Sequence, residues 1–508
     1  MPARLLQYFS PKSTTGSALI TLISRSVLVL GLSISAHISG WSETSIPYHD
    51  LLVSVPLSRA DQAQSGTIHQ SNAQPALPNH KNTKQLSVAR LPAAAEPLPN
   101  DPFAPDQWNF MTPDQFAGAA NIFNPPDHNR NLSRVVVAVV DSGMLLDHED
   151  YLALPGYDFV HDPDISNDGD GRDNDPTDPG DWVSTADLLE RRVSENCQPT
   201  PSKWHGTAIA GIIGAESGNN LGVAGGSDFV SLLPVRVTGK CGGYVNDLID
   251  GIRWAAGLSV SGAPDNPYPA RIINLSVGFP GQCSHRLQTA LDDAVKAGAI
   301  LVTASTNNGV SLDTNPYSPA TCDNVLSIGA TLRNGEQAEY SSYGSNVFLL
   351  SPGGSARDGI VTTDNRGRSE ADPASSYGYH FGTSMAAAHV SAALATLLTI
   401  DPSLSNQSLA KILSVSATPH TTDTRCNSSL CGHGLLNTNR AIQSLLNPEP
   451  QNDNPAYLIQ NQSAAPGIAA VQSAEAPSAG STHPAILFLL LLLACKNRIH
   501  TRLSRVLS

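Results

Sequence analysis

Short apolar runs without polar alternation recur along the middle of the chain. They are rich in β-branched residues, and they lie at residues 134–141, 232–237, 271–277, 299–305 and 324–330. A run of this kind is typical of a parallel strand that is covered on both faces, because neither face then needs polar side chains. The pattern therefore predicts a set of buried parallel strands.

Longer segments with helical character lie between or after these runs, at residues 205–215, 245–257, 285–298 and 382–398. Strands that alternate with helices predict an α/β fold, here a doubly wound, mostly parallel sheet with helices on both faces. In such folds the functional groups gather at the carboxyl ends of the strands.

The alternation of predicted strands and helices covers residues 98–446, which we expect to form one large domain. Residues 37–97 are rich in Gln, Asn, Ala, Ser and Pro and indicate a prosegment or a disordered leader. Residues 447–481 have a similar composition and are interpreted as a linker.

Both ends of the chain carry targeting features. Residues 1–36 combine basic residues with the apolar stretch "SVLVLGLSISA", which predicts a signal peptide and a secreted or cell-surface protein. Residues 482–508 hold "AILFLLLLLAC" and a basic tail. This run is shorter than the roughly 20 residues that span a bilayer, so it predicts a sorting or anchoring segment with transient membrane association.

Net charge and cysteine content limit the possible partners of the protein and indicate that it contains disulfides. The net charge is −14 and no concentrated basic face is evident, which argues against nucleic acid as a partner. Export favours disulfides, and six of the seven cysteines lie in the domain. Many pairings are possible, and we favour neighbours along the chain: Cys197–Cys241, Cys283–Cys322 and Cys426–Cys431.

Three polar residues stand where rigid elements begin or end. Asp141 follows a buried run, whereas His205 and Ser384 each open an apolar helical segment. A serine hydroxyl becomes a good nucleophile when an imidazole removes its proton, and a carboxylate holds the imidazole in the required tautomer. The three side chains together therefore predict nucleophilic catalysis.

The segments around these residues, "VVVAVVDSG", "HGTAIAGIIGA" and "FGTSMAAAHVSA", resemble those of the subtilisin-like serine peptidases, the subtilases. The order Asp, His, Ser agrees, and the resemblance covers about residues 100–446. It implies a secreted serine endopeptidase of proteins or peptides that works through an acyl-enzyme, with Asp141, His205 and Ser384 as catalytic residues and no redox or organic cofactor.

The resemblance also implies roles for residues outside the triad. Asn307 in "AILVTASTNNG" would be the oxyanion donor, with Asn308 as the alternative, although Thr306 stands where the family has glycine. A peptide substrate would add as a strand beside Ser276, Val277 and Gly278. Tyr317 would line the primary specificity pocket and disfavour large side chains.

Some positions depart from the family pattern. Alanine replaces a common histidine at 208, a proline at 388 and a glycine at 392. These changes, with Thr306, leave open a catalytically impaired subtilase-like surface module that binds protein partners. A related esterase is a further alternative, against which the missing GxSxG motif counts.

Residues 167–182, "NDGDGRDNDPTDPGDW", are unusually acidic. Dense carboxylates in a bent loop suit calcium, which takes six to eight oxygen ligands. Asp168, Asp170, Asp173 and Asp175 are the candidate ligands of a structural calcium ion. A solvated acidic loop without metal is an equally good interpretation, because the spacing is not that of an EF-hand.

Overall fold

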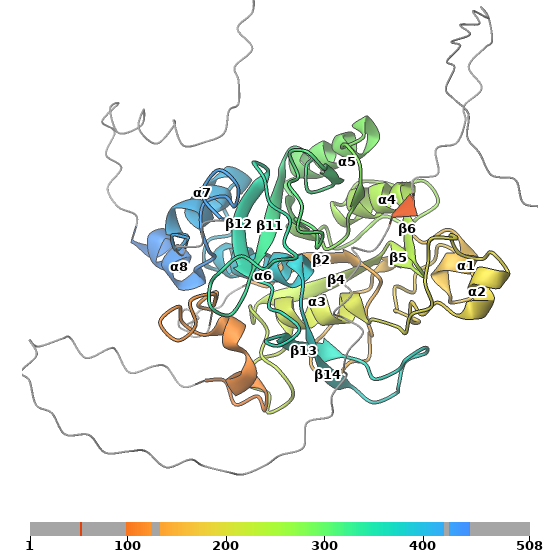
Figure 1. Cartoon of the computed structure of the whole chain (residues 1–508), viewed down its shortest axis with the longest axis horizontal. Helices are drawn as coiled ribbons and strands as arrows, with labels where there is room; N and C mark the ends of the chain where they lie inside the picture. Colours follow the sequence, from red (N-terminus) through yellow and green to blue (C-terminus); the bar gives the residue numbers. More distant parts are fainter. Residues whose placement is uncertain (1–50, 53–97, 123–132, 421–425, 448–508) are drawn as a thin grey trace, which may run out of the picture. The chain divides into compact units, whose positions relative to one another are not determined.

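A computed structural model of the chain describes residues 51–52, 98–122, 133–420 and 426–447 (Figure 1). The predicted signal peptide and C-terminal segment lie outside these residues, as do nearly all of the prosegment and the linker. Their boundaries therefore remain predictions.

A seven-stranded sheet forms the centre of the domain, with the order β12-β11-β9-β7-β2-β4-β3. All of its neighbouring strands pair in parallel. The strands are β2 (Val135–Asp141), β3 (Tyr157–Asp158), β4 (Val230–Arg236), β7 (Ile272–Leu275), β9 (Ile300–Ala304), β11 (Val325–Thr331) and β12 (Val347–Pro352). The doubly wound, mostly parallel sheet that the sequence predicts is thus confirmed.

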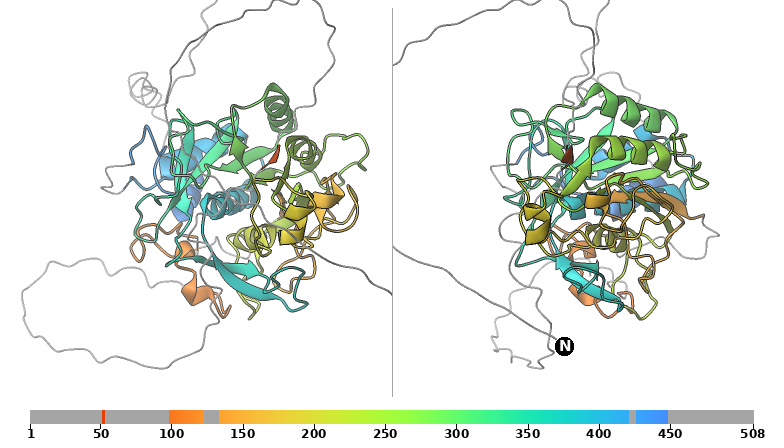
Figure 2. Two further views of the ribbon diagram at one scale, coloured as in Figure 1. Left: turned by 45° about the vertical axis from the view of Figure 1, so that its right-hand side comes forward. Right: turned by 90° about the vertical axis from the view of Figure 1, so that its right-hand side faces the viewer.

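Helices cover both faces of this sheet (Figure 2). One apolar core contains residues of α3 (His205–Gly214), α6 (Thr383–Ile400), α7 (Asn406–Ser416) and α8 (Thr438–Leu446), and the other contains residues of α4 (Val245–Ala255) and α5 (His285–Lys296). Successive side chains of β2 alternate between them, because Val137 and Val139 join the first core and Ala138 and Val140 the second. Both faces of the strand are dry, which explains its continuous apolar sequence.

Every predicted strand and helix has its counterpart, with ends that differ by a few residues. The sequence patterns missed β3 and β12, α7 and α8, and a hairpin of β13 (Ile360–Asp364) and β14 (Ser376–His380). The two strands of this hairpin pair antiparallel beside α3, where Thr362 and Thr363 donate to carbonyl oxygens of that helix. Two buried threonines interrupt β13, and most positions of β14 are partly exposed, so neither strand has a long apolar run.

Smaller elements complete the domain. Two 3-10 turns (Ala104–Asp106 and Trp108–Phe110) precede the sheet, α1 (Pro163–Ser166) and α2 (Thr185–Leu189) flank the acidic loop, and β8 (Phe279–Pro280) pairs with β10 (Tyr317–Ser318). A third small sheet joins β5 (Thr238–Gly239), β6 (Gly242–Tyr244) and β1 (Leu51–Leu52). β1 comes from the region predicted to be the prosegment, and it pairs antiparallel with β6.

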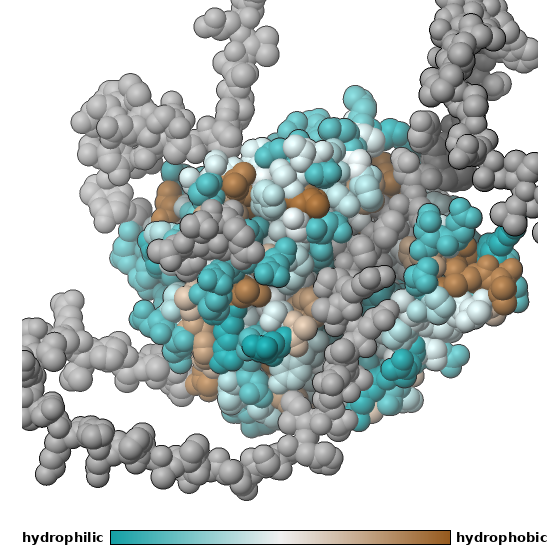
Figure 3. All heavy atoms as spheres, viewed as in Figure 1, coloured by the Kyte–Doolittle hydropathy of each residue, from teal (hydrophilic) through white to brown (hydrophobic). Residues whose placement is uncertain are grey.

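Among the described helices, only α6 is long and apolar enough to cross a membrane, and 89% of it is buried inside the domain. It is therefore a core helix of this fold. The visible surface is mostly hydrophilic (Figure 3). A hydrophobic area lies over α2, where Leu189 is 80% exposed.

The described structure contains the disulfides Cys197–Cys241, Cys283–Cys322 and Cys426–Cys431, with Cα–Cα distances of 5.9, 5.2 and 5.5 Å. These are the pairs of chain neighbours that the sequence favours. Such Cα separations are typical of bridged cysteines.

Candidate active site

The candidate site lies at one edge of the sheet, where three neighbouring strands end. Asp141 ends β2, Ser276 directly follows β7, and Asn307 stands shortly after β9. These strands lie side by side in the order β9-β7-β2. The carboxyl ends of parallel strands meet at the same edge, so the fold brings these distant residues together.

Asp141 and His205 form a direct pair. The Nδ1 atom of His205 lies 2.7 Å from Oδ1 of Asp141. Because a carboxylate can only accept, Nδ1 carries the proton and Nε2 is left as the basic nitrogen. Asp141 is buried and the His205 side chain is 20% exposed, so the imidazole keeps access to solvent or a substrate.

Burial and nearby charged residues both shift the pKa of His205. Burial alone would lower the pKa of His205, but the Asp141 carboxylate raises it, and the net shift is upward from the ordinary value. Lys203 lowers this pKa and Asp181 raises it, both by smaller amounts. Asp181 also accepts a hydrogen bond from the Lys203 backbone at 2.8 Å, so the two residues lie next to each other.

The pair is held by close contact between β2 and α3. A Cβ atom added to Gly206 would lie 1.9 Å from the carbonyl oxygen of Gly143, so only glycine fits. The Ser142 hydroxyl accepts from the Gly206 amide at 3.2 Å and donates to Asp178 at 2.8 Å. Asp178 is buried, which raises its pKa to about 7. Sequence reasoning missed this support, since Asp178 is one of many aspartates in the acidic loop.

Ser384 lies in the first turn of α6 and is 2% exposed. Its backbone carbonyl accepts from the Ser276 hydroxyl at 3.3 Å, and Ser276 in turn accepts from the Asn274 amide. Within the described residues, no hydrogen bond joins the Ser384 hydroxyl to His205. Catalytic hydrogen bonds in free enzymes are often long and shorten when substrate binds.

Asn307 is fixed against the same turn of α6. Its Oδ1 atom accepts from the Thr383 amide at 2.9 Å and from the Thr383 hydroxyl at 2.8 Å. The Nδ2 atom of Asn307 thereby keeps its two hydrogens available as donors. The neighbouring Asn308 is exposed, so the structure favours Asn307 of the two candidates. Sequence reasoning missed Thr383, although its place directly before Ser384 was a usable signal.

The predicted substrate segment is buried at its start. Ser276 and Val277 are each 3% exposed, and the chain continues through Gly278 into β8. There Tyr317 of β10 pairs with Pro280 and is half-buried. Tyr317 thus lies beside the end of the predicted substrate segment.

The four candidate calcium ligands are not gathered into a metal site. Asp168 pairs with the guanidinium of Arg236, which also binds Asp158. Asp170 and Asp175 are exposed, and Asp173 accepts from the Asp175 amide. The part of the chain that the structure describes contains no group of three or more His, Cys, Asp or Glu suited to a metal ion. The residues as placed do not fit calcium, because an arginine already neutralises Asp168.

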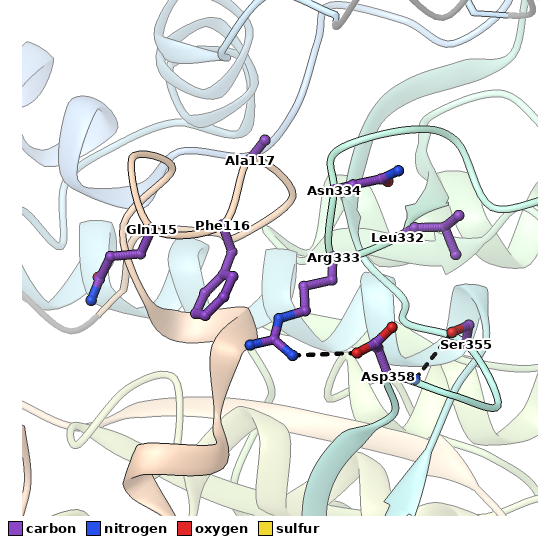
Figure 4. A pocket seen from close by; sticks show the side chains of 8 residues that line it. All are labelled: Gln115, Phe116, Ala117, Leu332, Arg333, Asn334, Ser355 and Asp358. Atoms are coloured by element: carbon purple, nitrogen blue, oxygen red, sulfur yellow. Dashed lines mark hydrogen bonds and ion pairs between the residues drawn. The ribbon is translucent and has the colours of Figure 1, made fainter. Parts of the chain in front are cut away.

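A separate hollow of about 380 Å³ lies between the loop of Phe116 and the loops that carry Arg333 and Asp358 (Figure 4). The Arg333 guanidinium stacks 4.0 Å over the Phe116 ring and contacts Asp358 at 3.3 Å. None of the candidate catalytic residues lines it.

A buried aspartate hydrogen-bonded to a histidine at the carboxyl edge of a parallel α/β sheet, with a serine in the first turn of α6, is the arrangement that the resemblance to the subtilases predicts. Residues 133–434 match the model of the subtilase family, Peptidase_S8. The chain belongs to the subtilase family.

Two proteins of similar sequence are named extracellular proteases. The chain is 37% identical over 402 residues to an extracellular basic protease of Dichelobacter nodosus, covering 73% of this chain and 62% of that protein. It is 36% identical over 351 residues to an extracellular protease of Xanthomonas campestris pv. campestris, covering 69% and 57%. The matched region thus spans less than two thirds of either relative.

A solved structure agrees with the fold. A protease from Pseudoalteromonas arctica PAMC 21717 superposes with a TM-score of 0.62 and 38% identity, covering 68% of this chain and 99% of that one.

Proposed function

We propose that this chain is a secreted serine endopeptidase that hydrolyses peptide bonds in proteins or peptides. The hydrogen bond between Asp141 and His205 carries the proposal, because it prepares Nε2 as a base at the edge where Ser384 and Asn307 lie. Secretion is supported by residues 1–36 and by the extracellular proteases among the relatives.

In the proposed reaction the Ser384 hydroxyl attacks the peptide carbonyl and gives its proton to Nε2 of His205. Asp141 holds Nδ1–H and stabilises the imidazolium. The backbone amide of Ser384 and Nδ2 of Asn307 donate to the oxyanion. His205 then protonates the leaving amine, and a water molecule deprotonated by His205 hydrolyses the acyl-enzyme.

The substrate is proposed to lie as an extended strand beside Ser276, Val277 and Gly278. Tyr317 borders this segment through its pairing with Pro280, so its ring would restrict the size of side chain that the primary pocket accepts. Small side chains are therefore expected at the cleaved bond.

A fluorophosphonate probe tests the proposal directly, because it reacts with serines that a nearby base activates. Peptide mass analysis should place the label on Ser384 in the processed, folded protein and show much less label in a His205→Ala variant. Folded protein that stays unlabelled would favour the binding-module alternative.

Replacing Asn307 with alanine should lower kcat by about 10²–10³, with KM nearly unchanged, because the lost donor acts on charge that develops in the transition state. Kinetics on a chromogenic peptide would measure this. Asn308→Ala, in the exposed neighbour, is the matched control and should remain near the native rate. The reverse pattern would transfer the oxyanion role to Asn308.

Two substitutions should move the pH profile in opposite directions. Asp181 raises the pKa of His205, so Asp181→Asn should shift the acidic limb of kcat/KM to lower pH, where the ring is now neutral. Lys203 lowers that pKa, and Lys203→Gln should shift the limb to higher pH. Lys296→Gln on α5, over the opposite face of the sheet, should leave it in place. Shifts of the same sign for Asp181→Asn and Lys203→Gln would contradict the assignment of His205 as the base.

A further inference from the structure

Thr306 has an unusual backbone conformation. Its φ angle is +79°, in the left-handed region, and the residue is fully buried. A β-branched residue is rarely found there, because its side chain crowds the backbone, whereas glycine enters the region without steric cost. The turn that leads from β9 into Asn307 is therefore built with a residue that does not favour it.

Ser342 contacts this residue twice. The Ser342 amide donates to the Thr306 carbonyl at 3.0 Å, and the two hydroxyl oxygens lie 2.9 Å apart. Both side chains are fully buried. Hydrogen bonds between buried hydroxyls fix a single local arrangement, since neither group can turn to water instead.

Ser342 also holds the chain on either side of Asn307. Its carbonyl accepts from the Ser305 hydroxyl at 3.1 Å, and its hydroxyl receives the Val310 amide at 3.4 Å. Thr383 thus fixes the side chain of Asn307, and Ser342 holds the segments that precede and follow it.

We propose that Thr306 and Ser342 act as positioning residues: their paired hydroxyls hold the left-handed turn at residue 306 and so aim the Asn307 amide at the oxyanion. This inference rests on the proposed role of Asn307. Oxyanion donors must be placed to within a few tenths of an ångström to act on the transition state, so a relaxed turn would reduce kcat and leave substrate binding intact.

The test uses substitutions at both positions in the full-length, processed enzyme. Thr306→Val keeps the shape and branching but removes the hydroxyl, and Thr306→Ser keeps the hydroxyl. Ser342→Ala removes the partner hydroxyl. We expect Thr306→Val and Ser342→Ala each to lower kcat by about tenfold with KM changed less than about twofold, and Thr306→Ser to remain near the native rate.

Substituting glycine for Thr306 provides a second, independent test. Because glycine adopts a positive φ unaided, Thr306→Gly should make the Ser342 hydroxyl dispensable. Adding Ser342→Ala to Thr306→Gly should then change kcat less than about twofold, against about tenfold in the native background, so that the two substitutions are not additive. Rates are expressed per active site titrated with a fluorophosphonate, so incomplete folding does not affect the comparison.

The outcomes separate this inference from the proposed function. If Asn307→Ala lowers kcat but Ser342→Ala does not, the pair has no positioning role and the oxyanion assignment stands. An equal effect of Ser342→Ala on kcat in the native and Thr306→Gly backgrounds would also contradict the positioning role of the two residues. A lower melting temperature with native kcat would show a purely structural contact. If Asn307→Ala itself keeps the native kcat, the oxyanion role of Asn307 fails and the inference fails with it.

Discussion

Ser384→Ala will abolish casein hydrolysis by the purified protein, with kcat reduced by about 10⁶, the size known for loss of the nucleophile in a subtilisin. The hydroxyl is the only part of Ser384 that changes, and it is the group proposed to form the acyl-enzyme. The residue is buried in the first turn of α6, and alanine favours a helix, so the fold should be kept.

Release of acid-soluble peptides from casein measures this result, with native and variant protein prepared in parallel. Thr399→Ala is a useful control, because it also removes a buried hydroxyl from α6, but one near the other end of the helix that donates to the Ala395 carbonyl. Equal cleavage by the native protein and Ser384→Ala would show that another residue, or a contaminating protein, hydrolyses the casein.

Asp141→Asn should reduce kcat by about 10⁴ with a small change in KM, an effect whose size is known from serine peptidases with the same triad. Asn has nearly the same shape, but it lacks the negative charge and can offer hydrogens where the carboxylate only accepts. His205 would lose the partner that fixes Nδ1–H at 2.7 Å and stabilises the imidazolium. The melting temperature should change little compared with the loss of rate.

Asp147→Asn makes the same chemical change at an exposed residue of the loop that follows β2, and it should leave kcat within about twofold of native. Steady-state kinetics of both variants on one peptide substrate provide the comparison. If Asp141→Asn retained a tenth or more of the native kcat, His205 would not depend on this carboxylate, and the proposed mechanism would be wrong.

Much of the fold could be predicted from local sequence. Both faces of β2, β4 and β9 are buried, and their uninterrupted apolar runs reflect that burial directly. The residues of the Asp–His pair were also predictable, because each stands at the end of a regular element within a distinctive segment. The edge strand β3 was missed because it has only two residues, and the β13–β14 hairpin because two buried threonines interrupt β13 and most positions of β14 are partly exposed.

The acidic loop shows what a local pattern leaves open. Its composition favours calcium as strongly as any stretch of the chain, yet the partner of Asp168 is Arg236, which is 68 residues away in sequence. A buried arginine satisfies carboxylates as a bound cation would, and the position of β4 beside β3 brings Arg236 to Asp168.

The class of fold and the residues of the Asp–His pair could be predicted from the sequence, because they depend on periodicity and on short contiguous segments. The disulfide pairs were one choice among many until the structure showed them. The neighbouring of β9, β7 and β2, the hydrogen bonds from Thr383 to the Asn307 side chain, and the contact of Ser342 with a left-handed Thr306 became visible only in the folded protein. The order of the strands and the positive φ angle of Thr306 arise from packing between segments far apart in the chain, and no local pattern encodes them.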